Sequence, residues 1–213
     1  MDASNAFNAM CRPLALWNAR VLWPRCANFL FNTYRGFPKT VFRRSKAVIL
    51  SREGTTQGDP LGMLMYAVGT LPLIRKLKGS QWRQSWYADD SACAGSLPNL
   101  KEWLNLLKQE GPKWGYHPEP QKSYLIVKPG KEEEARQLFP ELRVVGSHRY
   151  LGGIIGSTGA ESYVRDKVTK WIDHIDSFAE CAQKSPQATY TAFTKSLQME
   201  WAYLQRVVQG CVE

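Results

Sequence analysis

Along the first 156 residues, short apolar runs typical of strands alternate with segments whose apolar residues recur at helical spacing. Predicted strands cover residues 40–43, 47–50, 82–88, 91–95, 123–128 and 150–155. Predicted helices cover residues 13–23, 25–34, 60–78 and 97–107. This mixture favours an α+β or α/β layer, in which helices cover one sheet.

A purely helical pattern follows residue 159. Apolar side chains recur three or four positions apart on one face of a long predicted helix. They are Val164, Val168, Trp171, Ile172, Ile175, Phe178 and Ala182. A second helix is predicted from Pro186 to about Val208. We therefore expect two regions, 1–157 and 158–213, of which the second is a separate helical subdomain.

The loop at residues 51–60 is rich in turn-forming residues and ends in a helix-start signal. Asp59 suits the N-cap, and Pro60 suits the first helical position. Backbone N–H groups at a helix start favour an anion, and Gly58 lets a ligand approach the backbone closely. A capped turn without a ligand is the plainer interpretation of the same residues.

Two adjacent acids, Asp89 and Asp90, occupy the tight turn between the predicted strands 82–88 and 91–95. Their charges repel each other at close range. A Mg²⁺ ion takes one or two protein carboxylates and leaves its other positions to water and phosphates. The pattern therefore indicates a divalent-cation site, with an ordinary acidic turn as the alternative.

The charge is unevenly distributed. The chain has a net charge of +9, and residues 1–60 hold nine Lys or Arg against three acids. Trp17, Trp23, Tyr34 and Phe42 are interleaved with these cations. Basic and aromatic residues together indicate a polyanionic partner such as nucleic acid, although an ordinary basic surface explains the charge equally well.

Other residue patterns exclude some classes of protein. No apolar run approaches the roughly 20 residues of a membrane span, so no membrane partner is expected. The N-terminal residues do not resemble a signal peptide. Five scattered cysteines without a CxxC pair favour a reducing intracellular compartment, either nucleus or cytoplasm. His117, His148 and His174 lack ligand or triad spacing, and we interpret them as structural.

Five motifs, in order, resemble those of reverse transcriptases of the non-LTR retrotransposon type. Asp2-Ala3-Ser4-Asn5-Ala6-Phe7 is similar to the palm segment with the first metal-binding Asp. Gly-Thr-Thr-Gln-Gly-Asp-Pro-Leu at residues 54–61 resembles the loop against template and incoming nucleotide. Tyr87-Ala88-Asp89-Asp90 matches the palm hairpin. Gly115-Tyr116 with Lys122-Ser123 resembles the next motif, and Tyr150-Leu151-Gly152-Gly153 resembles the primer-grip turn. Five ordered matches are more specific than any single one.

The resemblance implies an RNA-directed DNA polymerase, which adds dNTPs to a primer 3′-OH on an RNA or DNA template. Asp2, Asp89 and Asp90 would hold two Mg²⁺ ions, for which Mn²⁺ is a possible substitute. Lys122 would protonate the leaving pyrophosphate or stabilise its charge. The fold implied is a palm-like antiparallel sheet covered by helices, followed by a partial thumb-like helical region.

Further roles are implied for the residues around the nucleotide. Asn5 and Ala6 would offer backbone N–H groups to the triphosphate, and Phe7 would exclude a 2′-OH. Gln57 and Gly58 would contact nucleotide and template.

The primer end would be held by Leu151, Gly152 and Gly153. A Gly-Gly turn beside a strand also needs no function at all, so the plain turn remains an alternative.

The same resemblance leads us to expect a fragment with little activity alone. The chain begins one residue before Asp2, so the strand that should hold this carboxylate and the preceding fingers are missing. We expect Asp2 to be poorly placed, unless further segments of the same polyprotein supply the fingers. The thumb is short, and no endonuclease or RNase H segment is recognisable.

Two rival hypotheses belong to other classes. A catalytically inactive, co-opted remnant would only bind nucleic acid through its basic first third. Another palm-fold nucleotidyltransferase or cyclase would need neither the Gln57-Gly58 loop nor the Leu151-Gly152-Gly153 turn.

Overall fold

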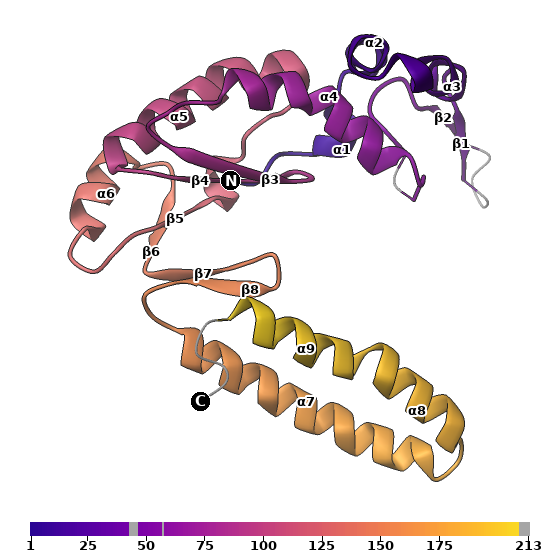
Figure 1. Cartoon of the computed structure of the whole chain (residues 1–213), viewed down its shortest axis with the longest axis vertical. Coiled ribbons are helices and arrows are strands. Elements are labelled where there is room, and N and C mark those ends of the chain that lie inside the picture. The colour runs from indigo at the N-terminus through magenta and orange to yellow at the C-terminus, as the bar shows by residue number, and fades with distance from the viewer. Residues whose placement is uncertain (43–46, 57, 209–213) are drawn as a thin grey trace. The chain divides into compact units, whose positions relative to one another are not determined.

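The computed structural model describes residues 1–42, 47–56 and 58–208, and this part of the chain is a mixed α+β protein that is mostly helical (Figure 1). The α-helices are α1 (Ala6–Ala9), α2 (Arg12–Leu22), α3 (Pro24–Tyr34), α4 (Gly62–Lys76), α5 (Leu97–Glu110), α6 (Glu132–Leu138), α7 (Ala160–Ala182), α8 (Pro186–Lys195) and α9 (Leu197–Val207). The 3₁₀ helices are η1 (Gly111–Trp114) and η2 (Pro120–Lys122). The strands are β1 (Lys39–Val41), β2 (Val48–Leu50), β3 (Arg83–Tyr87), β4 (Asp90–Ala94), β5 (Tyr124–Ile126), β6 (Arg143–Val145), β7 (Ser147–Tyr150) and β8 (Gly153–Gly156).

The described strands form four separate two-stranded sheets. Three of them, β1–β2, β3–β4 and β7–β8, are antiparallel pairs, and β5–β6 is parallel. The expected α+β class is therefore present, with its C-terminal helical region. One continuous palm-type sheet is not formed by these strands, because each is three to five residues long and pairs with a single named partner.

Helix α4 begins two residues later than predicted. The Asp59 carboxylate accepts a hydrogen bond from the Leu61 N–H at 2.9 Å, which closes a local turn before the helix. Asp59 therefore shapes the entry to α4 and does not cap it, and the helix begins at Gly62.

The predicted strand 150–155 is a hairpin instead. β7 pairs with β8, and the two turn residues Leu151 and Gly152 both have positive φ, 47° and 82°. Two left-handed residues in a row reverse the chain between antiparallel strands. The second predicted C-terminal helix is likewise interrupted, because Ser196 has a non-helical backbone and separates α8 from α9.

The chain divides into two compact units, which we describe separately. The first comprises Met1–Ser123 and Leu138–Leu142, and the second comprises Tyr124–Gln137 and the residues from Arg143 onward. The boundary predicted near residues 156–160 lies inside the second unit, where β8 ends and α7 begins.

The core of the first unit lies between its helices and the β3–β4 hairpin. Helix α2 packs against α3 and α4, and Figure 1 shows α4 and α5 on one side of the hairpin. Large, fully buried side chains fill this core: Met10, Leu30, Met65, Leu73, Leu77, Leu104, Leu107, Tyr116 and Phe139.

A helical hairpin forms most of the second unit. Figure 1 shows α7 antiparallel to α8 and α9. Their buried residues are Trp171, Leu197, Leu204 and Val208. The Trp201 ring lies 5.9 Å from Trp171 and 5.7 Å from Phe193, so aromatic contacts join all three helices.

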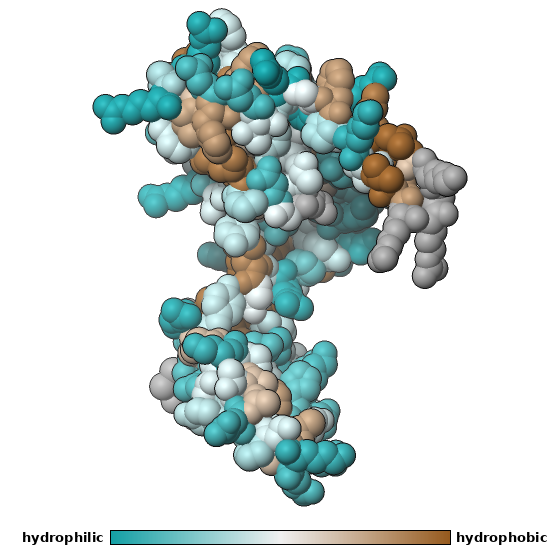
Figure 2. Space-filling model, turned by 90° about the vertical axis from the view of Figure 1, so that its right-hand side faces the viewer, coloured by the Kyte–Doolittle hydropathy of each residue, from teal (hydrophilic) through white to brown (hydrophobic). Residues whose placement is uncertain are grey.

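The β1–β2 hairpin leaves apolar side chains in water. Val41 is 65% exposed, and Val48 and Ile49 are 52% and 56% exposed. Figure 2 shows brown, apolar surface at this hairpin.

No helix among the described residues is both long and apolar enough to cross a membrane.

Candidate active site

The β3–β4 hairpin predicted around the acid pair is present. Tyr87 at the end of β3 pairs with Asp90 at the start of β4, and Ala88 and Asp89 form the turn between them. Ala88 has a φ of 53°, which lets the chain reverse in two residues. Asp89 and Asp90 therefore lie at the tip of the hairpin, and both are half-buried.

Residues 1–3, which precede a turn at Ser4 and Asn5, lie beside this hairpin. Met1 and Ser91 exchange two backbone hydrogen bonds, of 2.6 Å and 3.1 Å. The Asp2 N–H donates to Ser123 Oγ at 3.0 Å, and the Asp2 carbonyl accepts from the Glu119 N–H at 2.9 Å. The Asp2 backbone is therefore hydrogen-bonded through both of its polar groups, so this terminal segment is tethered to its neighbours.

Tyr116 lies buried beneath the hairpin tip. Its hydroxyl donates to the Asp89 carbonyl at 3.0 Å and is 2.9 Å from Ser91 Oγ. Its pKa is raised above the ordinary value, first by burial and further by the negative charges of Asp2, Asp89 and Asp90, while the hydrogen bond with Ser91 opposes the rise. All three predicted acids thus contribute to the raised pKa of this phenol.

The acids also act on one another. The pKa of Asp90 is raised, first by burial and then by the charges of Asp89 and Asp2, whereas the N-terminal ammonium lowers it. Burial and the neighbouring carboxylates together therefore disfavour the charged form of Asp90. A cation at this position would relieve the repulsion between the carboxylates.

A second buried tyrosine, Tyr66 on α4, packs against Phe7. The Tyr66 and Phe7 rings stack with their centroids 4.6 Å apart, and the Tyr66 hydroxyl has no hydrogen-bond partner among the described residues. Burial raises the pKa of Tyr66, and the charges of Tyr116 and Asp89 add to the rise. The sequence analysis missed Tyr66, although a hydroxyl on the buried face of an apolar helix was a usable signal.

The loop before α4 packs against the segment that contains Phe7. The Gly54 N–H donates to the Met10 carbonyl at 2.8 Å, and the Thr55 N–H donates to the Phe7 carbonyl at 2.9 Å. A Cβ on Gly54 would lie 2.3 Å from the Phe7 carbonyl oxygen, so glycine is required there. Two motifs that are about 50 residues apart in the sequence are thereby adjacent in the structure.

The remaining residues predicted near the nucleotide have different environments. Asn5 is exposed with a φ of 49°, and its side-chain oxygen accepts a hydrogen bond from Asn8 Nδ2 at 2.6 Å. Ala6 is buried. Gly58 is exposed with a φ of 89°, and Gln57 lies outside the described residues.

Lys122 is an exposed residue on η2. Its ammonium lies 4.0 Å from the Glu119 carboxylate, and this is its ion pair among the described residues. The structure thus pairs Lys122 with Glu119 and with none of the three aspartates.

The Leu151-Gly152-Gly153 turn belongs to the second unit. The Tyr163 hydroxyl donates to the Gly152 carbonyl at 2.7 Å, and the Tyr203 hydroxyl donates to the Leu151 carbonyl. A Cβ on Gly153 would lie 3.1 Å from the Val207 side chain. Helices α7 and α9 therefore hold the turn in place.

Metal-ligating side chains do not gather in larger groups. Within the described residues, no three or more His, Cys, Asp or Glu side chains are placed to hold a metal ion together. The His148 ring stacks on Tyr124 with the centroids 3.5 Å apart.

No protein-family model matches the chain, and no curated protein matches it either.

Proposed function

We propose that the chain is the RNA-directed DNA polymerase module of a retrotransposon, which adds dNTPs to a primer 3′-OH on an RNA or DNA template. The supporting observation is that Met1 and Ser91 are joined by backbone hydrogen bonds, so that the segment with Asp2 lies beside the hairpin tip that carries Asp89 and Asp90. β3, β4, residues 1–3 and residues 117–119 lie side by side in that order, each pair antiparallel. We interpret them as the central part of a palm-like layer.

Two Mg²⁺ ions, or Mn²⁺ in their place, fit the chemistry of these acids. Mg²⁺ uses few protein carboxylates and completes its coordination with water and phosphates, so a larger protein cluster is not required. When bound, the ions activate the attacking 3′-hydroxyl and neutralise the departing pyrophosphate. Asp2, Asp89 and Asp90 would hold them, and Tyr116 would position Asp89 through its backbone carbonyl.

The other residues would bind and orient the substrates. Phe7, fixed against Tyr66, would contact the sugar of the incoming nucleotide and exclude a 2′-OH. Asn5, Ala6, Gln57 and Gly58 would present backbone N–H groups to the nucleotide.

Lys122 would stabilise the charge of the leaving pyrophosphate after releasing Glu119. Leu151, Gly152 and Gly153 would hold the primer end.

Primer extension tests this proposal. A labelled DNA primer on an RNA template is incubated with dNTPs and Mg²⁺ or Mn²⁺, using the full chain, an Asp89→Asn variant and an Asp166→Asn variant. Asp166 is an exposed acid on α7 and controls for the change in charge. We expect extension by the chain and by Asp166→Asn, and a loss of at least about 100-fold in Asp89→Asn.

A catalytically inactive nucleic-acid-binding remnant is the second candidate. The observation that favours it is the basic first third of the chain, where residues 1–60 hold nine Lys or Arg against three acids. The result that would establish it is salt-sensitive binding of the primer–template by a folded chain that extends no primer with either ion.

A further inference from the structure

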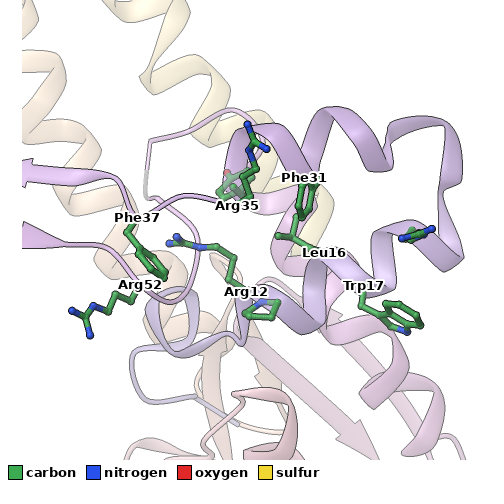
Figure 3. A pocket seen from close by; sticks show the side chains of 10 residues that line it. Arg12, Leu16, Trp17, Phe31, Arg35, Phe37 and Arg52 are labelled. Carbon is green, nitrogen blue, oxygen red and sulfur yellow. The ribbon is translucent and has the colours of Figure 1, made fainter.

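A pocket of about 390 Å³ lies in the first unit, lined by residues of α2 and α3 and of the segments around β1 and β2 (Figure 3). It shares no residue with the carboxylate site. Its wall contains four arginines, Arg12, Arg20, Arg35 and Arg52. These side chains supply much of the positive charge of residues 1–60, so the question is which of them are available to a ligand.

Arg12 is not available, because the protein itself uses its donors. Its guanidinium is buried and donates to the carbonyls of Gly36, Ser51, Glu53 and Gly54 over 2.7–3.0 Å, and to Ser51 Oγ at 2.9 Å. Arg12 therefore builds the pocket by tying the segment around β1 and β2 to α2.

The other three arginines carry uncompensated charge. Arg20, Arg35 and Arg52 are exposed, and none has an ion pair with an acid among the described residues. Arg35 lies over the Phe31 ring at 5.8 Å, and Arg52 lies over the Phe37 ring at 6.0 Å. Three cations around one pocket without an internal counter-ion favour an anionic ligand.

The same pocket exposes aromatic rings. Phe31, Phe37 and Trp17 are 51%, 58% and 63% exposed. Figure 3 shows Arg12 with Phe37 on one side and Phe31 and Leu16 on the other. Exposed aromatic faces next to arginines suit a flat, conjugated group that stacks on a ring while its charge pairs with a guanidinium.

The volume limits the size of what can enter. About 390 Å³ is in the range of sites that hold one small ligand. It suits a single base with its sugar, and a double helix cannot enter it. An acidic peptide supplies negative charge without a ring at each residue, whereas a single-stranded nucleic acid supplies both in every nucleotide.

We propose that this pocket binds one unstacked nucleotide of a single-stranded nucleic acid. The base lies against Phe31 and Phe37, and the neighbouring phosphates contact Arg20, Arg35 and Arg52. This role does not require polymerase activity, since the pocket and the carboxylates have no residue in common.

Charge-matched variants test the phosphate contacts. Binding of a labelled 12-nucleotide oligo(dT) is measured by fluorescence anisotropy over a range of salt concentrations. Arg35→Gln/Arg52→Gln is compared with Arg75→Gln/Arg83→Gln, which removes the same charge from exposed positions outside the pocket. We expect the pocket pair to weaken binding at least tenfold more than the control pair, and to reduce the salt slope by about 1.4. Equal effects of the two pairs would overturn the proposal.

Phe37→Ala and Phe29→Ala test the stacking, because both phenylalanines are 58% exposed and only Phe37 lines the pocket. We expect Phe37→Ala to weaken oligo(dT) binding by about 5- to 150-fold and Phe29→Ala to leave it nearly unchanged. An abasic oligonucleotide of the same length should not distinguish the two variants. If Phe37→Ala binds oligo(dT) as tightly as Phe29→Ala, or if a polyglutamate peptide with tryptophans binds the pocket in preference to oligo(dT), the proposal is wrong.

The two proposals fail separately. Loss of extension with intact Phe37-dependent binding would contradict only the polymerase. If the chain extends the primer, but substitution of Phe37, Arg35 and Arg52 leaves its oligo(dT) binding unchanged, only the pocket proposal is contradicted.

Discussion

Tyr66 and Tyr116 are buried at the same site, but their hydroxyl groups are in opposite situations. Tyr116 bonds to the Asp89 carbonyl and to Ser91 Oγ, whereas the Tyr66 hydroxyl has no partner among the described residues. A buried hydroxyl without a hydrogen bond destabilises the folded state, whereas a buried hydroxyl with two hydrogen-bond partners stabilises it.

Phenylalanine substitutions should therefore act in opposite directions. We expect Tyr116→Phe to reduce the free energy of unfolding by about 1–3 kcal/mol, because it leaves Ser91 Oγ and the Asp89 carbonyl without a buried donor. Tyr66→Phe keeps the stacking on Phe7 and should be neutral or stabilising. Urea denaturation measures both, and an equal loss in the two variants would contradict the assigned hydrogen bonding.

Arg12 is a second residue whose role follows from its surroundings. A lysine in its place carries the charge but not the planar fork of donors. We expect Arg12→Lys to lower the free energy of unfolding by at least about 2 kcal/mol, measured in urea. Arg20→Lys, on the same helix and exposed, should change it by less than about 0.5 kcal/mol. Comparable stability of the two variants would disprove the structural role of Arg12.

Residue types and spacing predicted the β3–β4 hairpin that carries Asp89 and Asp90, but not the buried Tyr116 that hydrogen-bonds to it. The roles that the resemblance gave to Asp2, Asp89 and Asp90 stay predictions. Charge counts could not separate the buried Arg12 from the exposed Arg35, because burial depends on contacts between segments far apart in the chain.

At the scale of elements, periodicity predicted α2, α3, α5 and the β3–β4 hairpin to within a few residues. Periodicity failed where the backbone conformation of a single residue determines the end of an element. Leu151 has a positive φ, which leucine rarely adopts, so the apolar pattern predicted a strand through the β7–β8 turn although Gly152 and Gly153 marked a turn there. The parallel partner of β5 also escaped prediction, since pairing across an intervening helix leaves no local pattern.

The close approach of the backbone after η1 to helix α1 can be tested by substitution of a glycine. Gly115, after η1, has a φ of 76°, and a Cβ there would lie 2.2 Å from the Ala9 carbonyl oxygen of α1. Gly58 has a φ of 89°, and no atom of the described residues lies within 4 Å of its Cβ position, so Gly58→Ala isolates the cost of the backbone conformation, about 1–2 kcal/mol.

Gly115→Ala should cost about 1–3 kcal/mol more than Gly58→Ala, because overpacking adds to the same strain. Thermal unfolding of both variants measures the difference. Equal melting temperatures would show that α1 does not approach Gly115 as closely as described.

At the scale of the whole molecule, the segment Leu138–Leu142 returns the chain to the first unit. Phe139 is buried there, with Lys101 5.1 Å above its ring. Glu141 pairs with Lys108 at 2.7 Å and with Lys101 at 3.3 Å. The segment is thus fixed to α5 by one apolar and one charged contact.

The ion pairs of Glu141 make the stability of the first unit depend on pH. Burial alone raises the pKa of Glu141, but hydrogen bonds from Lys108, its own backbone N–H and Lys101 outweigh burial and lower the pKa from 4.5 to about 2. A lowered carboxyl pKa stabilises the folded state above about pH 4.5, and this contribution is lost as the pH falls towards about 2.

Glu141→Gln should therefore be less stable than the unmodified chain near pH 6 and should lose less stability between pH 4.5 and 2. Urea denaturation at a series of pH values measures this. Glu102→Gln, an exposed change on α5, is the control and should keep the original acid dependence. An unchanged pH profile in Glu141→Gln would rule out the contribution of this pair.

The return of residues 138–142 also determines how the protein can be taken apart. The chain passes from one unit to the other three times, after Ser123, after Gln137 and after Leu142. No single proteolytic cut can therefore separate the two units cleanly. A polypeptide that ends at Ser123 loses Phe139 and Glu141, and the shortest polypeptide that keeps the first unit complete ends at Leu142 and carries β5 and α6 with it.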